Sequence, residues 1–178
     1  MTAIPTYVPL IPLPAPLTSG TTTQSYTDPN GDVWVAKNGV NGGNWGRARD
    51  VLFARVWRSA AYTYSTTATN MPFDTVSRDL YGMWGSPVFT FPVVGVYKLD
   101  AQCCVAFTAA GQFIGMNTGR TRSNIYSGGV SNSYSHIHDL AYYNAGDQVA
   151  IGVNTSASLT CIAGSGDTYF SIAYMGTG

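Results

Sequence analysis

The sequence predicts an all-β sandwich, and three observations lead to this prediction. Charged residues make up only 10% of the 178 residues, against about 25% in average globular proteins, and no residue is Glu. Strong charged helix formers are therefore scarce, whereas Gly, Ser, Thr, Asn and Tyr, which favour strands and turns, are abundant. Short apolar segments recur with Gly, Asn, Ser or Pro between them, which is typical of a sandwich.

The length fits one domain with an appendage, and we predict three parts. Residues 1–25 form an extended N-terminal arm, residues 26–53 form a small hairpin and loop module, and residues 54–178 form the head domain.

The arm contains prolines at positions 5, 9, 12, 14 and 16, so it is extended and cannot form a helix interior or a central strand. A disordered tail is one interpretation. Because the segment is apolar and carries no charge, we instead expect an arm that becomes ordered on a partner surface. Its candidate anchoring side chains are Ile4, Tyr7, Val8, Leu10, Ile11 and Leu13.

The module after the arm has the pattern of a β-hairpin. Residues 28–31, Asp-Pro-Asn-Gly, form a turn with Pro early and Gly late. The following alternation places Val33 and Val35 on one face and Trp34 on the other. Trp34 and Trp45 are further candidate anchors, and residues 47–53 are expected to contain a short helical turn.

The most specific strand pattern lies at residues 89–107. Phe89 and Phe91 share one face, because strand side chains repeat every two residues. Pro92 cannot donate to a strand ladder, and Gly95 allows a bend or a close backbone approach. A long alternating strand then runs to Phe107.

With the Gly146–Val149 segment, Gly-Asp-Gln-Val, this Phe-x-Phe-Pro-x-x-Gly-x-Tyr element resembles the globular heads of the complement and tumour-necrosis-factor (TNF) superfamily, over roughly residues 54–176. The resemblance implies a ten-stranded jelly roll that assembles as a homotrimer. By the same resemblance, the candidate trimer-interface residues are Tyr62, Tyr97, Tyr169, Phe170 and Tyr174.

A second resemblance covers residues 28–45. The pattern D-x-x-G-x-V-W-V-A-K-x-G-V-N-G-G-N-W is similar to the N-terminal region of head-fibre and minor structural proteins of tailed bacteriophages. It implies a virion structural protein made in the host cytoplasm, a capsid decoration protein that binds the major capsid protein and lies on the capsid surface. The alternative is a tail-tip receptor-binding protein that contacts tail proteins and recognises a host surface glycan. A secreted complement-like head is less favoured, because the N-terminus has no secretory signal pattern.

No residue pattern predicts an enzyme or a cofactor. Ser135, His136 and Asp139 are closer in sequence than catalytic triads usually are, and no G-x-S-x-G motif is present. His136 and His138 have the spacing of metal ligands on a strand, but no Cys or carboxylate cluster lies beside them in sequence. We therefore predict a polar strand end and no metal.

Two other groups of polar residues are candidate binding sites. Asp28, Asn30 and Asp32 have the spacing of a calcium loop, but Pro29 and the missing Glu favour a simple turn. Arg120 and Arg122 are candidates for contact with a sugar or a phosphate, although a solvated turn is the simpler interpretation.

The net charge is zero, so nothing predicts binding to nucleic acid or to a membrane surface. Three cysteines, Cys103, Cys104 and Cys161, are expected to be reduced and buried in a chain made in the cytoplasm. The alternative is a disulfide between one of the two adjacent cysteines and Cys161. The two adjacent cysteines point to opposite faces of their strand.

Overall fold

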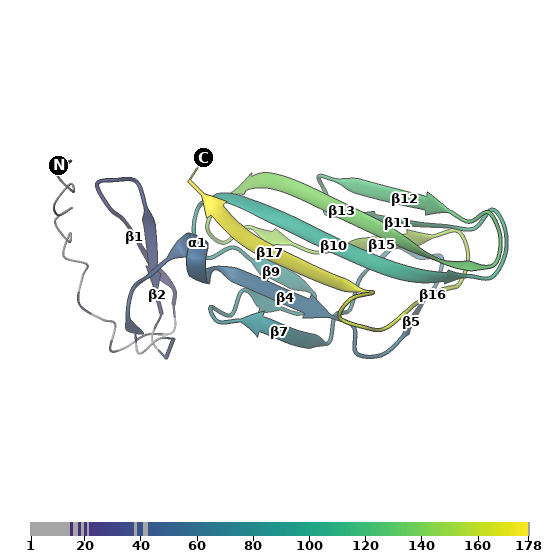
Figure 1. The fold of residues 1–178 in the computed structure, drawn as a ribbon, viewed down its shortest axis with the longest axis horizontal. Helices are drawn as coiled ribbons and strands as arrows, with labels where there is room; N and C mark the ends of the chain where they lie inside the picture. The colour runs from purple at the N-terminus through teal and green to yellow at the C-terminus, as the bar shows by residue number, and fades with distance from the viewer. Residues whose placement is uncertain are drawn as a thin grey trace, which may run out of the picture.

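Long antiparallel strands run along the long axis of the molecule, and a small sheet covers one end (Figure 1). The computed structural model describes residues 22–37, 39–40 and 43–177, together with the single residues 15, 18 and 20. The arm residues predicted as anchors, Ile4, Tyr7, Val8, Leu10, Ile11 and Leu13, lie outside this described part.

The small sheet at one end has the order β1-β2-β3. Its elements, with the helix that follows, are β1 (Gln24–Thr27), β2 (Val33–Ala36), β3 (Gly46–Arg47) and α1 (Ala48–Val51). The predicted hairpin is confirmed: β1 pairs antiparallel with β2, and Gly31 in the turn has a φ of 85°, which glycine adopts without strain. In the described residues no helix is long and apolar enough to span a membrane.

The larger sheet contains seven strands and is organised around a long central strand. Its members are β4 (Phe53–Trp57), β5 (Tyr62–Tyr64), β7 (Thr75–Asp79), β10 (Gly95–Phe107), β13 (Ser131–Tyr143), β16 (Leu159–Cys161) and β17 (Tyr169–Gly176). β13 pairs with β10 along its whole length, whereas β17 and then β16 pair with the opposite edge of β10. β13 is therefore an edge strand of 13 residues.

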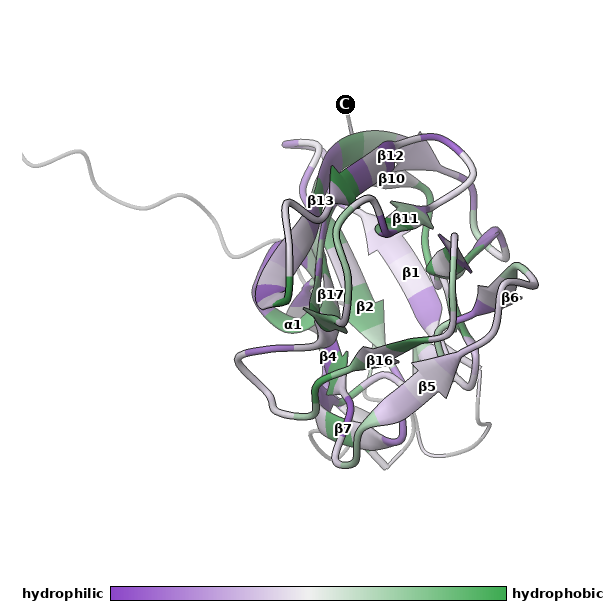
Figure 2. Ribbon diagram, turned by 90° about the vertical axis from the view of Figure 1, so that its right-hand side faces the viewer, coloured by the Kyte–Doolittle hydropathy of each residue, from purple (hydrophilic) through white to green (hydrophobic). Residues whose placement is uncertain are grey.

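The second layer consists of two smaller groups of strands, with the orders β12-β11-β15-β6 and β14-β9-β8. They are β6 (Thr69–Asn70), β8 (Trp84–Gly85), β9 (Val88–Thr90), β11 (Phe113–Asn117), β12 (Arg122–Tyr126), β14 (Gln148–Val149) and β15 (Gly152–Thr155). Viewed along the long axis, the strands wrap around a common interior (Figure 2). The predicted all-β sandwich is confirmed, with more and shorter strand segments than the ten that were expected.

Aromatic side chains from the predicted Phe-x-Phe-Pro element fill the interior. Phe89 and Phe91 are both fully buried, as the shared face requires. Phe91 stacks on Tyr143 with ring centroids 3.9 Å apart and contacts Tyr97 at 4.5 Å. The close approach predicted at Gly95 is also confirmed: its φ is 152°, and an added Cβ would lie 2.4 Å from the ring of Tyr174.

The hairpin module packs on the head through a continuous core. Val33, Val35 and Leu52 belong to the same buried cluster as the aromatic residues of the head. Tyr81 in the head donates a hydrogen bond of 3.3 Å to the carbonyl of Val35, and Lys37 Nζ donates one of 2.8 Å to the carbonyl of Tyr81. The module is therefore a cap on one end of the sandwich, which we call the base of the molecule.

The cysteine prediction is wrong for two of the three residues. Cys103 on β10 and Cys161 on β16 form a disulfide that crosses 58 residues of sequence, and Cys104 is free and buried. Cys103 and Cys161 belong to the core cluster whereas Cys104 does not, so the two adjacent cysteines do point to opposite faces. Burial raises the pKa of the Cys104 thiol, which disfavours the reactive thiolate.

Candidate interaction surfaces

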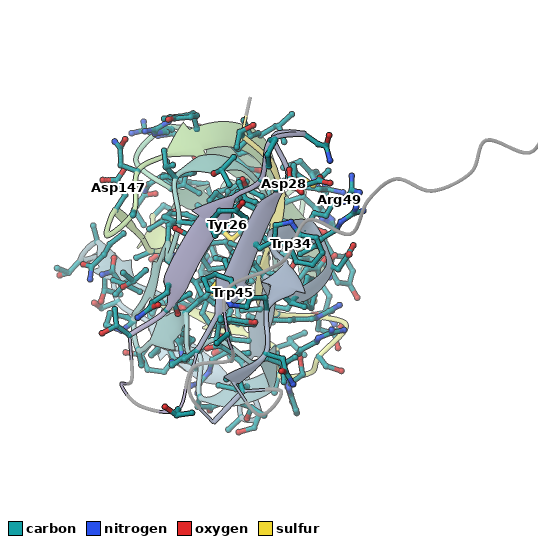
Figure 3. All side chains as sticks on the ribbon, turned by 90° about the vertical axis from the view of Figure 1, so that its left-hand side faces the viewer. Tyr26, Asp28, Trp34, Trp45, Arg49 and Asp147 are labelled. Carbon is teal, nitrogen blue, oxygen red and sulfur yellow. A yellow bond between two sulfur atoms is a disulfide. The ribbon has the colours of Figure 1, made fainter. Side chains whose placement is uncertain are left out.

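The outer face of the small sheet carries a half-buried aromatic group at the base (Figure 3). Val33 and Val35 of β2 point into the core, so Trp34 between them points outward and is half-buried. Tyr26 on β1 is opposite Trp34 in the strand register, and its ring contacts Trp45 edge-on with centroids 6.3 Å apart. Both tryptophans predicted as anchors therefore lie on this surface, which we call the hairpin face.

Charged groups fix the Trp34 side chain. Its indole Nε1 donates a hydrogen bond of 3.1 Å to Asp28 Oδ2, and the guanidinium of Arg47 lies 5.5 Å from the centre of its ring. Arg47 also forms an ion pair of 3.1 Å with Asp32. This arrangement leaves one indole face covered by a cation, which stabilises a surface tryptophan.

The Asp28 loop is a turn, as predicted, because its carboxylate is turned toward its own backbone. Asp28 Oδ1 accepts hydrogen bonds of 2.9 Å from the Asn30 N–H and 3.0 Å from the Asp32 N–H. The hydrogen bond from Trp34 is the largest cause that lowers the pKa of Asp28, and these backbone bonds act in the same direction. The carboxylate is therefore ionised and satisfied within the loop.

Trp45 differs from Trp34 in its polar atom. Its Nε1 is buried and has no hydrogen-bond partner. A buried donor without a partner costs free energy within the fold. The two tryptophans therefore differ: a hydrogen bond to Asp28 holds the Trp34 ring, whereas the Trp45 ring is held by packing alone, including the edge contact with Tyr26.

A second surface is the outer face of the seven-stranded sheet. Along β13 the outward side chains are all exposed: Tyr134, His136, His138, Leu140 and Tyr142. Leu140 is 65% exposed and Tyr142 is 49% exposed, and Met175 on β17 adds a third large apolar side chain at 53%. The solvated face of an antiparallel sheet is normally polar. Three large apolar side chains exposed on this face are therefore unusual for a monomer.

Polar side chains cross the middle of this outer face. Asp100 on β10 is opposite His138 in register, and its Oδ1 lies 3.3 Å from His138 Nδ1. The hydroxyl of Tyr169 donates to the same carboxylate at 3.4 Å and 3.5 Å. The rings of His136 and His138 are nearly parallel, with centroids 6.0 Å apart. Sequence analysis missed Asp100, because only the register between β10 and β13 brings it to the histidines.

Of the five predicted trimer-interface residues, three are buried within the chain and two are accessible. Tyr97 and Phe170 are fully buried and Tyr174 is 4% exposed, so these three side chains are already covered within one chain. Their predicted role needs correction, because alternation along β10 and β17 turns them inward. Tyr62 and Tyr169 remain accessible; Tyr62 contacts Tyr64 edge-on, with centroids 4.8 Å apart, and the Arg55 guanidinium lies 4.1 Å from the centre of the Tyr169 ring.

Ser135, His136 and Asp139 do not form a catalytic arrangement. Ser135 is buried, and its hydroxyl donates a hydrogen bond of 3.1 Å to the Ser123 hydroxyl. The neighbouring His136 points to the opposite side of β13. In the described part of the chain no group of three or more His, Cys, Asp or Glu side chains could hold a metal ion.

The predicted Arg120 and Arg122 turn lies beside a hollow near the base. The hollow has a volume of about 360 Å³ and is lined by Thr118, Gly119, Arg120, Tyr143, Asp147 and Gln148. Arg120 is held by a hydrogen bond of 3.1 Å to the carbonyl of Tyr142, and its guanidinium lies 4.6 Å from the centre of the Tyr143 ring. Arg122 lines an adjoining hollow of about 240 Å³.

The fold is similar to that of several solved structures. The Eiger TNF of S. frugiperda matches with a TM-score of 0.53 at 10% identity, covering 71% of this chain and 93% of that chain. The globular domain of the zebrafish complement 1qA protein matches with a TM-score of 0.52 at 11% identity, covering 71% and 98%. Murine APRIL matches with a TM-score of 0.50 at 12% identity, covering 69% and 98%.

These similarities establish the fold: the head is a jelly roll of the TNF and complement-head type. No family model and no curated protein matches the sequence.

Proposed function

We propose that this chain is a non-enzymatic, homotrimeric decoration protein of a tailed-bacteriophage capsid, which attaches to the major capsid protein through its N-terminal arm and hairpin face. The observation that carries the proposal is the outward-facing, half-buried aromatic group of the hairpin face at the base, where the chain enters β1. The resemblance of residues 28–45 to head-fibre and minor structural proteins of phages supports the same assignment.

Self-association through the outer sheet face is part of this proposal. Leu140, Tyr142 and Met175 expose apolar area on a sheet whose edge strand β13 has 13 residues. Long, exposed edge strands with apolar faces are normally covered in native proteins. A closed trimer buries the same patch on every subunit, and aromatic residues are favoured at such interfaces.

Capsid attachment is tested with particles that lack this protein. We expect the Trp34→Ala, Trp45→Ala double variant to bind the particles at least about 30-fold more weakly, because a buried Trp hot spot contributes at least about 2 kcal/mol. Deletion of residues 1–25 should also remove attachment. Because the chain carries little charge, attachment should depend weakly on salt.

The matched control is Tyr126→Ala, which removes a 70% exposed aromatic side chain from β12 in the head. This variant should decorate the particles normally. All variants are first checked for an unchanged melting temperature and oligomeric state. If the armless protein and the double Trp variant both still saturate the particles, the anchor lies in the head and the proposal is wrong.

The Arg120 hollow favours a second candidate function, a tail-tip protein that binds a host surface glycan. A fixed arginine, the Asp147 carboxylate and the Gln148 amide would offer donors and acceptors to sugar hydroxyls beside the Tyr143 ring. In this case Arg120→Ala should abolish adsorption to host cells while the protein stays on the virion. Loss of decoration in the Trp34 and Trp45 variant with normal adsorption would exclude this candidate.

A further inference from the structure

An exposed pair of imidazoles lies on the outer face of the seven-stranded sheet. His136 and His138 alternate with the buried side chains of β13, so both project from the same side. Their ring planes differ by 11°, and the His138 side chain is 65% exposed. Two histidines at this spacing on a strand place their ring nitrogens within reach of one ion after a modest rotation of the exposed rings.

Asp100 orients one of the two rings. Its Oδ1 lies 3.3 Å from His138 Nδ1, so a metal ion bound through Nε2 would leave Nδ1 facing the carboxylate. The Tyr169 hydroxyl donates to the same carboxylate and holds it in place from β17. A carboxylate behind an imidazole is the arrangement that raises the basicity of a metal-ligating histidine.

We propose that His136 and His138, with Asp100 as the positioning residue, bind a borderline divalent transition-metal ion such as Zn²⁺. Imidazole nitrogen suits Zn²⁺, Ni²⁺ and Cu²⁺, whereas Ca²⁺ and Mg²⁺ require several oxygen ligands. The carboxylate of Asp100 is engaged by His138 and Tyr169, and the cationic Lys98 lies two residues along the same strand. The site therefore favours a nitrogen-binding ion over a hard cation.

Each chain supplies two imidazole ligands, because Asp100 faces His138 and Tyr169, and in the described residues no group of three or more His, Cys, Asp or Glu side chains could hold a metal ion alone. We infer that the same pair from a neighbouring copy completes the coordination sphere. Only this completion rests on the proposed self-association through the outer sheet face. The metal would then link subunits across the interface that Leu140, Tyr142 and Met175 form.

The chain has only two histidines, so imidazole-dependent binding can be measured cleanly on a full-length protein from which any affinity tag has been removed. The experiment is equilibrium dialysis against Zn²⁺ with Ca²⁺ and Mg²⁺ as competitors, followed by elemental analysis and light scattering. We expect bound zinc in the wild type, at fewer than one ion per chain when it is shared. His136→Ala and His138→Ala should each abolish tight binding.

Asp100 is tested separately, because it acts through His138. Asp100→Ala should weaken zinc affinity by about 10–100-fold, the usual loss for a partner behind a metal ligand. Asp100→Asn keeps an acceptor oxygen, so its zinc affinity should fall less than that of Asp100→Ala. The matched control is Lys98→Ala, on the same face of β10, which should bind zinc at least as tightly as the wild type.

The outcomes separate this inference from the proposed function. Zinc binding that the His136→Ala, His138→Ala double variant does not reduce, or no zinc binding by a stable trimer, overturns the metal site alone. A monomer that binds zinc through both histidines supports the metal site and contradicts the proposed trimer.

Discussion

Trp34 and Asp28 join the outer face of the hairpin to its turn: the indole Nε1 donates a hydrogen bond of 3.1 Å to Asp28 Oδ2. The other oxygen of the same carboxylate accepts the N–H groups of Asn30 and Asp32. One ionised side chain therefore holds both the turn and the half-buried Trp34 ring at the proposed attachment surface. If Asp28 is protonated, the ring and the turn are loosened together.

The first prediction concerns acid. The Trp34 hydrogen bond is the largest cause that holds the pKa of Asp28 below its ordinary value of 3.8; the backbone bonds and Arg47 add to it, and partial burial opposes it. Because the folded-state pKa is depressed, this stabilisation is complete above the unfolded-state pKa and is lost as the pH falls through the folded-state pKa. The indole ¹⁵N–¹H resonance of Trp34 should shift with a midpoint below pH 3.8.

Asp28→Asn is the matched control for this titration, because the amide keeps an acceptor oxygen but does not ionise. Its Trp34 resonance should not titrate in the acid range. A wild-type midpoint at or above the ordinary Asp value would contradict the role assigned to the hydrogen bond.

The second prediction concerns the core. Phe91→Ala removes a fully buried ring that stacks on Tyr143 at 3.9 Å and contacts Tyr97. The expected loss of unfolding free energy is about 3–5 kcal/mol, which is a large part of the stability of a domain. Urea unfolding measures it. Tyr126→Ala, at a 70% exposed site, should change the free energy of unfolding by less than about 0.5 kcal/mol.

The third prediction concerns the cysteines. Under denaturing, non-reducing conditions a thiol reagent should label one cysteine per chain, Cys104, and should label all three after reduction. Replacing Cys103 and Cys161 by Ala together should lower the free energy of unfolding by about 2–4 kcal/mol. Labelling of three thiols without reductant, in protein exposed to air, would show that the disulfide is absent.

The fourth prediction concerns self-association. Leu140→Arg places a charge in the apolar row on β13, where the wild-type side chain is 65% exposed, so the chain should still fold. In a closed trimer the three new charges would be buried and unpaired, which is costly. Light scattering should therefore report a folded monomer. Tyr126→Arg on β12 is the control and should leave the trimer intact; a trimeric Leu140→Arg variant would place the interface elsewhere.

The sequence alone determined the local elements of this protein. Turn chemistry at residues 28–31 and the alternation around Trp34 predicted the hairpin, because both signals are contained within a few residues. The Phe-x-Phe-Pro pattern predicted the buried face of Phe89 and Phe91 for the same reason. The resemblance of these elements, in their order, to TNF and complement heads predicted the jelly roll, and the structural comparisons confirm this fold.

Only the tertiary structure decided which side chains meet across strands. The pairing of β10 with β16 and β13 brings Cys103 to Cys161 and Asp100 to His138, and neither partner has a local signal in sequence. The same register turns Tyr97, Phe170 and Tyr174 inward and leaves Leu140 and Tyr142 exposed. A shift of one residue would exchange these two sets, so strand register, which long-range packing fixes, decides which surface is available to a partner.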